Sequence, residues 1–383
     1  MERFEGESNT AVENSGGGND RSGADTTVNA SYDNYSDIQQ STAEEMNENT
    51  AAAGAAAADN GAAAVRERYP TILGASFLYL ITLSLMLISS FLFAGWQDEG
   101  INYYIFMFVL QFAIIALPAL VYMAVNKIPV RKTIRLNAVS VPEFFLTIGM
   151  AVFGYFIIIP INAIWYMLLS RIGTPQAPAL PPIETGSQFL FALIVIAGVP
   201  AAFEEFLFRG VIQRGYERLG LLFSILMTGC LFAMLHLSIV SLPSIILLGI
   251  MLCYIVYRSN SILTSIIYHF VNNSIAIVLT FIQGIISKFL PMEGAVESLE
   301  ALPSEELVAA IIFWCVIGVF ALALFGACFA GFHIVTRKRS SILPKEYASS
   351  PGKGVRQLIP AIGAGVIVLF LLAMEIVTMV IGL

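Results

Sequence analysis

The stretch AAFEEFLFRG, residues 201–210, decides the fold of this chain because it places two glutamates and an arginine in an apolar run. That run extends from about residue 187 to 217, and a helix of about 20 apolar residues is long enough to cross a bilayer. Ionisable side chains within such a helix are costly and usually mark a functional site. Glu204, Glu205 and Arg209 are therefore the first candidates for such a site.

The composition supports a membrane protein. The 383 residues are 57% hydrophobic and only 12% charged, against about 25% charged in soluble domains, and the mean hydropathy is +0.78. Residues 1–65 hold 12 of the 27 acidic residues and 2 of the 20 basic ones, so this tail carries a charge of −10 and the remainder +3. Nothing in this pattern indicates a nucleic-acid partner, and the lipid bilayer is the expected environment.

Residues 1–65 contain few large apolar side chains and end in an alanine-rich run, which predicts a disordered, acidic, low-complexity tail. Long apolar segments follow. The predicted fold class is all-α, a polytopic membrane helix bundle of about nine transmembrane helices, with the number uncertain by one. The nine segments lie near residues 71–94, 101–125, 143–170, 187–215, 220–240, 242–257, 260–284, 306–333 and 357–382.

The charges between these segments predict an orientation. Basic residues precede the first segment (Arg66 and Arg68), follow the second (127–135) and follow the eighth (337–339), whereas the loops at 96–100 and 174–182 are acidic or uncharged. By the positive-inside rule the N-terminus is cytoplasmic, and an odd number of spans puts the C-terminus outside. We therefore expect an integral protein of the plasma (cell) membrane.

Helical spacing separates the two glutamates. Glu205 and Arg209 stand four residues apart on one helix face, in the favourable order of acid before base. Glu204 is rotated by about 100° from its neighbour, so it has no partner on its own helix. Taken alone, the Glu205–Arg209 pair is also compatible with an ordinary ion pair near the membrane surface. The unpaired Glu204 is harder to explain in that way.

Two of the three histidines lie within predicted spans. His236 follows FAML, and His269 stands four residues before Asn273 and on the same helix face. The depths of Glu204, His236 and His269 are compatible with one polar cluster shared by three helices, although each histidine alone would also suit a hydrogen-bonded packing role. The third histidine, His333, lies beside basic residues at a predicted membrane interface.

Such a cluster contains the groups that a hydrolase needs. A carboxylate beside an imidazole deprotonates a water, while a second imidazole and an amide donate hydrogen bonds to the oxyanion formed when that water attacks a carbonyl. Two histidines and a glutamate are also a possible zinc ligand set, but the HExxH pattern is absent. The four cysteines lie in apolar runs without CxxC spacing, which predicts packing roles and no disulfide framework.

Three motifs carry a family resemblance. EEFLFR fits EExxxR, FAMLH fits FxxxH and HFVNN contains HxxxN, in this order on successive predicted helices. Together they resemble the CPBP family of intramembrane glutamate proteases, which includes the CAAX prenyl endopeptidases and bacteriocin-processing or immunity proteins. The resemblance covers about residues 140–285. It leaves residues 1–65 as the tail, residues 66–139 as two accessory helices and residues 286–383 as two C-terminal helices.

The resemblance implies an intramembrane endopeptidase that cleaves a membrane-associated, prenylated or bacteriocin-like peptide or membrane protein without a metal or other cofactor. It implies that Glu204 and His236 activate the water and that His269 and Asn273 form the oxyanion hole. Glu205 and Arg209 would organise this site. The same polar cluster is also compatible with a proton-coupled transporter, although repeated halves are not evident in the sequence, or with a non-catalytic membrane scaffold.

Overall fold

The computed structural model describes residues 68–93, 101–176, 180–289, 304–339 and 351–382, and every element in this part of the chain is helical. The predicted all-α fold is therefore confirmed. The predicted acidic tail lies outside the described residues. Contacts divide the chain into Met1–Arg66 and Glu67–Leu383, and the described helices belong to the second unit.

Eight helical runs in the described residues are long and apolar enough to cross a membrane. The segment predicted at 220–240 is the exception, because its helix, α10, has only 15 residues and ends at Leu235. At a rise of about 1.5 Å per residue, α10 covers about 22 Å, which is less than the roughly 30 Å hydrocarbon core. The elements are α2 (Ile72–Leu92), α3 (Ile101–Gln111), η1 (Phe112–Ala116), α4 (Leu117–Val125), α5 (Val130–Thr133), α6 (Val141–Leu169), α7 (Gly186–Ala192), η2 (Leu193–Gly198), α8 (Val199–Glu205), η3 (Phe206–Ile212), α9 (Gln213–Tyr216), η4 (Glu217–Leu219), α10 (Leu221–Leu235), α11 (Leu242–Ser259), α12 (Ile262–Phe289), α13 (Ser304–Val335), α14 (Pro351–Arg356) and α15 (Ile359–Ile381).

Two membrane helices contain a π-helical turn just before a proline. At the end of η1, Leu117 precedes Pro118 and donates its N–H to the carbonyl of Phe112. At the end of η2, Val199 precedes Pro200 and donates its N–H to the carbonyl of Ile194. Proline lacks an N–H and clashes with the preceding turn of an α-helix, and the wider π turn relieves both problems. The runs 101–125 and 186–219 therefore continue through their prolines as single spans.

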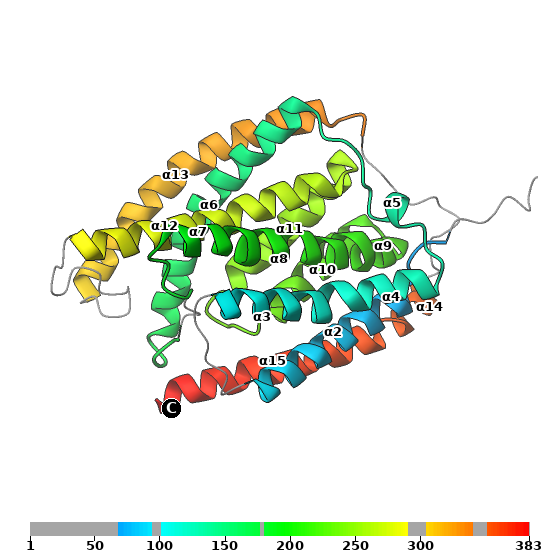
Figure 1. Cartoon of the computed structure of the whole chain (residues 1–383), viewed down its shortest axis with the longest axis horizontal. Helices are drawn as coiled ribbons and strands as arrows, with labels where there is room; N and C mark the ends of the chain where they lie inside the picture. The colour runs from blue at the N-terminus through cyan, green and yellow to red at the C-terminus, as the bar shows by residue number, and fades with distance from the viewer. Residues whose placement is uncertain (1–67, 94–100, 177–179, 290–303, 340–350, 383) are drawn as a thin grey trace, which may run out of the picture. The chain divides into compact units, whose positions relative to one another are not determined.

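Five helices at the centre of the described unit pack against one another. Helix α12 packs against α6, α8 and α11, and α10 pairs with α11 (Figure 1). A Cβ atom on Gly249 of α11 would lie 2.8 Å from the carbonyl oxygen of Gly229 in α10, which is too close for any side chain. Glycine at this position thus allows the two backbones to touch. Helix α15 packs beside α2 and contacts α10.

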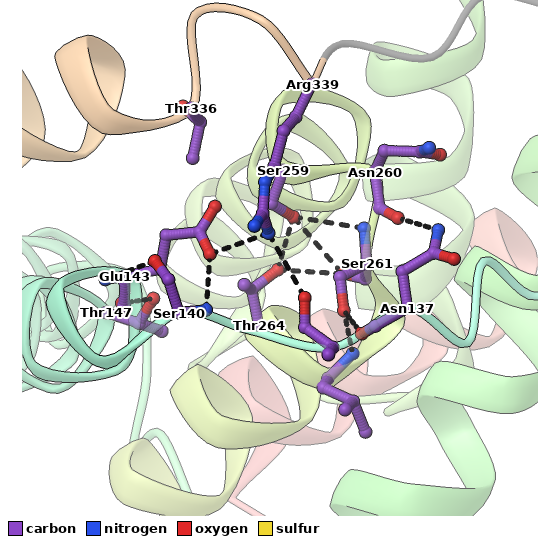
Figure 2. Close-up of polar contacts among 12 residues, drawn as sticks. Asn137, Ser140, Glu143, Thr147, Ser259, Asn260, Ser261, Thr264, Thr336 and Arg339 are labelled. Carbon is purple, nitrogen blue, oxygen red and sulfur yellow. Dashed lines mark hydrogen bonds and ion pairs between the residues drawn. The ribbon is translucent and has the colours of Figure 1, made fainter.

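Polar side chains join the ends of α6, α11 and α12 (Figure 2). At the start of α6, Ser140 and Glu143 form a capping box, and Glu143 Oε2 also accepts a hydrogen bond from Arg339, which follows α13, at 2.8 Å. The amide of Asn137 donates to the carbonyl of Asn260 in the turn between α11 and α12 at 2.6 Å. These contacts fix the registers of three helices at one end of the bundle.

Candidate active site

All four residues predicted to be catalytic line one cavity of about 550 Å³. They are Glu204, His236, His269 and Asn273. Helices α6, α8, α10, α11 and α12 contribute to its wall, together with the loops beside them. Apolar and polar side chains both line it, so it suits a ligand with an apolar body and polar main-chain groups. The other lining residues are Tyr155, Ile158, Asn162, Leu180, Ile196, Pro200, Phe232, Ser241, Ser244, Ile245, Leu248, Asn272, Ala276 and Ile277.

The predicted Glu205–Arg209 ion pair is present and lies behind the cavity wall. Arg209 Nη1 donates to Glu205 Oε1 at 2.8 Å, and both side chains are fully buried. Arg209 Nη2 donates to the carbonyl of Gly249 at 3.1 Å, and its guanidinium lies 4.4 Å from the ring centre of Phe232. A buried cation with a carboxylate, a carbonyl and an aromatic face around it is well compensated, so the pair anchors η3 against α10 and α11.

His269 stands between the two glutamates. Its Nδ1 lies 3.0 Å from Glu205 Oε1, and its Nε2 lies 4.0 Å from Glu204 Oε2. An ionised carboxylate only accepts hydrogen bonds, so Nδ1 is the donor and Glu205 fixes the ring orientation. The sequence did not predict this contact with Glu205. Glu205 thus holds two cationic or donor groups, Arg209 and His269, on one oxygen.

Each glutamate of this cluster has a buried Oε2 without a hydrogen-bond partner among the described residues, but of the two only Glu204 lines the cavity. Glu204 has one further contact. Its Oε1 accepts a long hydrogen bond of 3.4 Å from Nε2 of Gln111, and its Oε2 is buried without a hydrogen-bond partner among the described residues. The residue is 8% exposed and lines the cavity. A buried carboxylate oxygen without a partner is costly unless a water or ligand group satisfies it. Glu204 Oε2 is therefore available to a molecule in the cavity.

The sequence predicted that His236 lies within a helix, but it is the C-cap of the short helix α10, directly after Leu235. It is exposed, and its Nδ1 lies 2.9 Å from the carbonyl oxygen of Phe232. Since a carbonyl only accepts, Nδ1 carries the proton and Nε2 of the neutral ring keeps its lone pair. His236 thus has a basic nitrogen free at the cavity wall.

Phe232 connects the two histidines. Its ring packs edge-on against His236, with centroids 5.0 Å apart, and against His269 at 5.7 Å. It also faces the guanidinium of Arg209. The sequence indicated only a packing role for this residue, one turn before His236. The structure shows that the same ring fixes the spacing of three polar side chains.

The sequence prediction also missed two amides. Gln111 ends α3, and Asn162 lines the cavity from α6 with a buried Oδ1 that has no hydrogen-bond partner among the described residues. Each interrupts a long apolar run, which is the signal that could have identified it. Asn273 lines the cavity with its neighbour Asn272, as its spacing from His269 predicted. His333 is absent from the cavity wall and contacts Tyr254 through its Nδ1 at 3.0 Å.

The zinc alternative has no matching ligand set here. In the part of the chain that the structure describes, no group of three histidine, cysteine or acidic side chains is close enough to hold a metal ion. The four cysteines are all free thiols, as their spacing predicted.

The family comparison agrees with the motifs. Residues 186–275 match the family model described as type II CAAX prenyl endopeptidase Rce1-like. This range runs from the start of α7 into α12 and includes Glu204, Glu205, Arg209, His236, His269 and Asn273. No curated protein and no solved structure matches the chain. The match confirms the predicted resemblance to this family over residues 186–275.

Proposed function

We propose that this chain, an integral membrane protein whose residues 186–275 belong to the Rce1-like CAAX protease family, is an intramembrane endopeptidase that uses Glu204 to activate water. The observation that carries the proposal is the buried Glu204 Oε2, without a hydrogen-bond partner among the described residues, at the wall of a cavity that His236, His269 and Asn273 also line. A carboxylate in this setting is a suitable general base.

In the proposed reaction, Glu204 and His236 Nε2 accept hydrogen bonds from the attacking water, and Glu204 takes its proton. The water oxygen bonds to the peptide carbonyl carbon, and the carbonyl oxygen becomes an oxyanion. The C–N bond then breaks, and the proton held by Glu204 passes to the leaving nitrogen. The products are a carboxylic acid and an amine, so no electron donor or acceptor is needed.

His269 and Asn273 would stabilise the oxyanion. Because Nδ1 of His269 donates to Glu205, donation to substrate from Nε2 requires a ring that is protonated on both nitrogens. Two ionised glutamates, Arg209 and a protonated His269 together carry no net charge, which lowers the cost of placing them in a membrane. Glu205 and Arg209 therefore organise the site without contacting the substrate.

The proposed substrate is a membrane-associated peptide, prenylated or bacteriocin-like, whose chain enters from the bilayer. The mixed wall of the cavity supports this class, because side chains such as Ile245 and Ile277 suit an apolar group and the amides of Asn162 and Asn272 suit a peptide backbone. We assign no metal or other cofactor to the reaction.

We further propose the plasma membrane as the location, with a cytoplasmic N-terminus and an external C-terminus. Near the start of α2, the carbonyl of Pro70 accepts a hydrogen bond from Arg218, at the end of the fourth span. Near the end of α15, the carbonyl of Met379 accepts a hydrogen bond from the N–H of Thr174, which follows the third span. The two ends of the described unit thus lie beside opposite ends of the span 186–219, as an odd number of crossings requires. In this arrangement α10 counts as a crossing completed by the loop that follows it.

Comparative analysis of new peptide termini tests the proposal. Membranes that contain wild-type protein, Glu204→Gln or the control Glu184→Gln, which changes an exposed loop glutamate, would be compared by mass spectrometry. We expect a set of termini shared by wild type and Glu184→Gln and absent with Glu204→Gln. Identical termini in all three samples would contradict the proposed hydrolysis.

A further inference from the structure

The loop between α10 and α11 carries part of the candidate site and contains one strained backbone position. It begins at His236 and ends at Ser241, and both residues line the cavity. Within it, Leu237 has a positive φ of 50°, a backbone conformation that costs a bulky L-residue about 1 kcal/mol or more. Contacts from outside the loop therefore help to hold this backbone conformation next to His236.

Two membrane helices supply those contacts through one residue of the loop. The N–H of Ile239 donates to Glu375 Oε2 of α15 at 2.8 Å, and its carbonyl accepts from Trp165 Nε1 of α6 at 2.8 Å. Both polar groups of Ile239 are thus bonded by side chains. These groups lie three residues after His236, so the hydrogen bonds limit how far the histidine can move.

Glu375 lies in an otherwise apolar helix. It is the one ionisable residue in α15, a helix apolar enough to span the membrane, and a carboxylate in such a helix is costly and therefore a candidate functional residue. Helix α15 lies outside the range that matches the family model, and so does Trp165. The contact of α15 with α10 brings this carboxylate to the loop.

We propose that Glu375 and Trp165 are positioning residues that clamp the loop and hold His236 at the cavity, so that the C-terminal helix α15 becomes part of the catalytic apparatus. The inference rests on the proposed function, since it gives His236 a task in hydrolysis. It differs from simple helix docking in one respect. A docking contact would affect folding, whereas this clamp controls the rate at which bound substrate reacts.

The first test compares Glu375→Leu, which removes the acceptor, with Glu375→Gln, which keeps an oxygen for the Ile239 N–H. The matched control is Val377→Ala, an exposed position on the same helix. Purified proteins would be assayed in proteoliposomes on a peptide identified from the termini above. For Glu375→Leu we expect kcat to fall about 10-fold to 100-fold, as small misplacements of catalytic groups do, with KM within about 2-fold. Glu375→Gln should keep kcat within about 3-fold of wild type.

A coupling measurement separates positioning from general destabilisation. If Glu375 acts through His236, then Glu375→Leu should lower kcat by less than about 2-fold in a His236→Ala background. Trp165→Phe, which removes the second hydrogen bond of the clamp, should show the same dependence on His236. Equal losses from Glu375→Leu with and without His236, or an unchanged kcat in the single variant, would overturn the inference.

Amide hydrogen exchange tests the clamp without relying on activity. In Glu375→Leu the Ile239 N–H loses its acceptor, so exchange in the peptide covering residues 236–241 should accelerate about 10-fold or more, and Val377→Ala should exchange as wild type does. Unchanged exchange in Glu375→Leu would overturn the inference. If Glu204→Gln retained full cleavage, the proposed function would fail, and exchange alone would then decide whether the clamp exists.

Discussion

Replacing Glu205 by glutamine should destabilise the protein, whereas the same change at Glu204 should not. Glu205 and Arg209 are fully buried and 2.8 Å apart, and Glu205 also accepts from His269. Without the carboxylate charge, the Arg209 cation keeps the Gly249 carbonyl and the rings of Phe208 and Phe232. Breaking a buried ion pair from one side costs about 3–5 kcal/mol, and we expect the lower value because the glutamine oxygen still accepts a hydrogen bond.

The consequence is measurable as a melting temperature. A loss of about 3 kcal/mol lowers Tm by about 6–12 °C in a cooperative unit of 150–250 residues, and by less in a larger one. A thiol-reactive fluorescent dye suits the assay, because Cys253 on α11 is completely buried and becomes reactive only when the helices separate. Wild type, Glu204→Gln and Glu205→Gln would be heated in the same detergent.

Glu204→Gln should change the free energy of unfolding by less than about 1 kcal/mol, because Oε2 has no hydrogen-bond partner among the described residues and the contact with Gln111 is long. The double variant Glu205→Gln/Arg209→Met removes both charges and should recover part of the stability lost in Glu205→Gln. Equal melting temperatures for the two single variants would refute the assignment of Glu205 as the structural carboxylate.

Three further outcomes are expected. If the Asn273 amide donates to the oxyanion, Asn273→Ala should lower kcat about 100-fold to 1,000-fold with little change in KM. Steady-state kinetics on an identified peptide would instead show a raised KM and an unchanged kcat if the residue only binds substrate. Gly249→Ala should lower both Tm and kcat. The new Cβ would lie 2.8 Å from the Gly229 carbonyl oxygen and would displace the Gly249 carbonyl, which accepts a hydrogen bond from Arg209. An unchanged Tm would show that α10 and α11 can separate without cost. A cysteine at Gln176 should react with an impermeant reagent in intact cells, and one at Lys127 only after permeabilisation, whereas the reverse pattern would invert the proposed topology.

Local patterns in the sequence predicted much of the fold and the composition of the site. Hydropathy gave the long helices because each span needs its own apolar run, whatever its neighbours are. The i,i+4 spacing gave the Glu205–Arg209 pair, since a helical turn places these positions together. His236 and His269 were identified as site candidates because the chain has only three histidines and these two lie in apolar runs.

The features that the sequence did not predict depend on contacts between helices. Gln111 lies 93 residues before Glu204 along the chain, and the bond between Glu205 and His269 depends on how α12 packs on α8. The extent of α10 was predicted wrongly because residues 236–240 are apolar enough to continue a helix, yet they form a loop whose backbone groups bond to Glu375 and Trp165. A local pattern carries no information about such distant partners.

The cleavage rate of one identified peptide by metal-depleted protein tests the central claim most directly. Wild-type protein and Glu204→Gln would be dialysed exhaustively against a chelator, reconstituted in proteoliposomes and assayed side by side. If Glu204 activates the water, wild-type protein should keep its full rate, and Glu204→Gln should be slower by about 100-fold to 10,000-fold, the usual contribution of a general base. A wild-type rate that disappears on chelation and returns with added Zn²⁺, or a Glu204→Gln rate equal to that of wild type, would contradict the account.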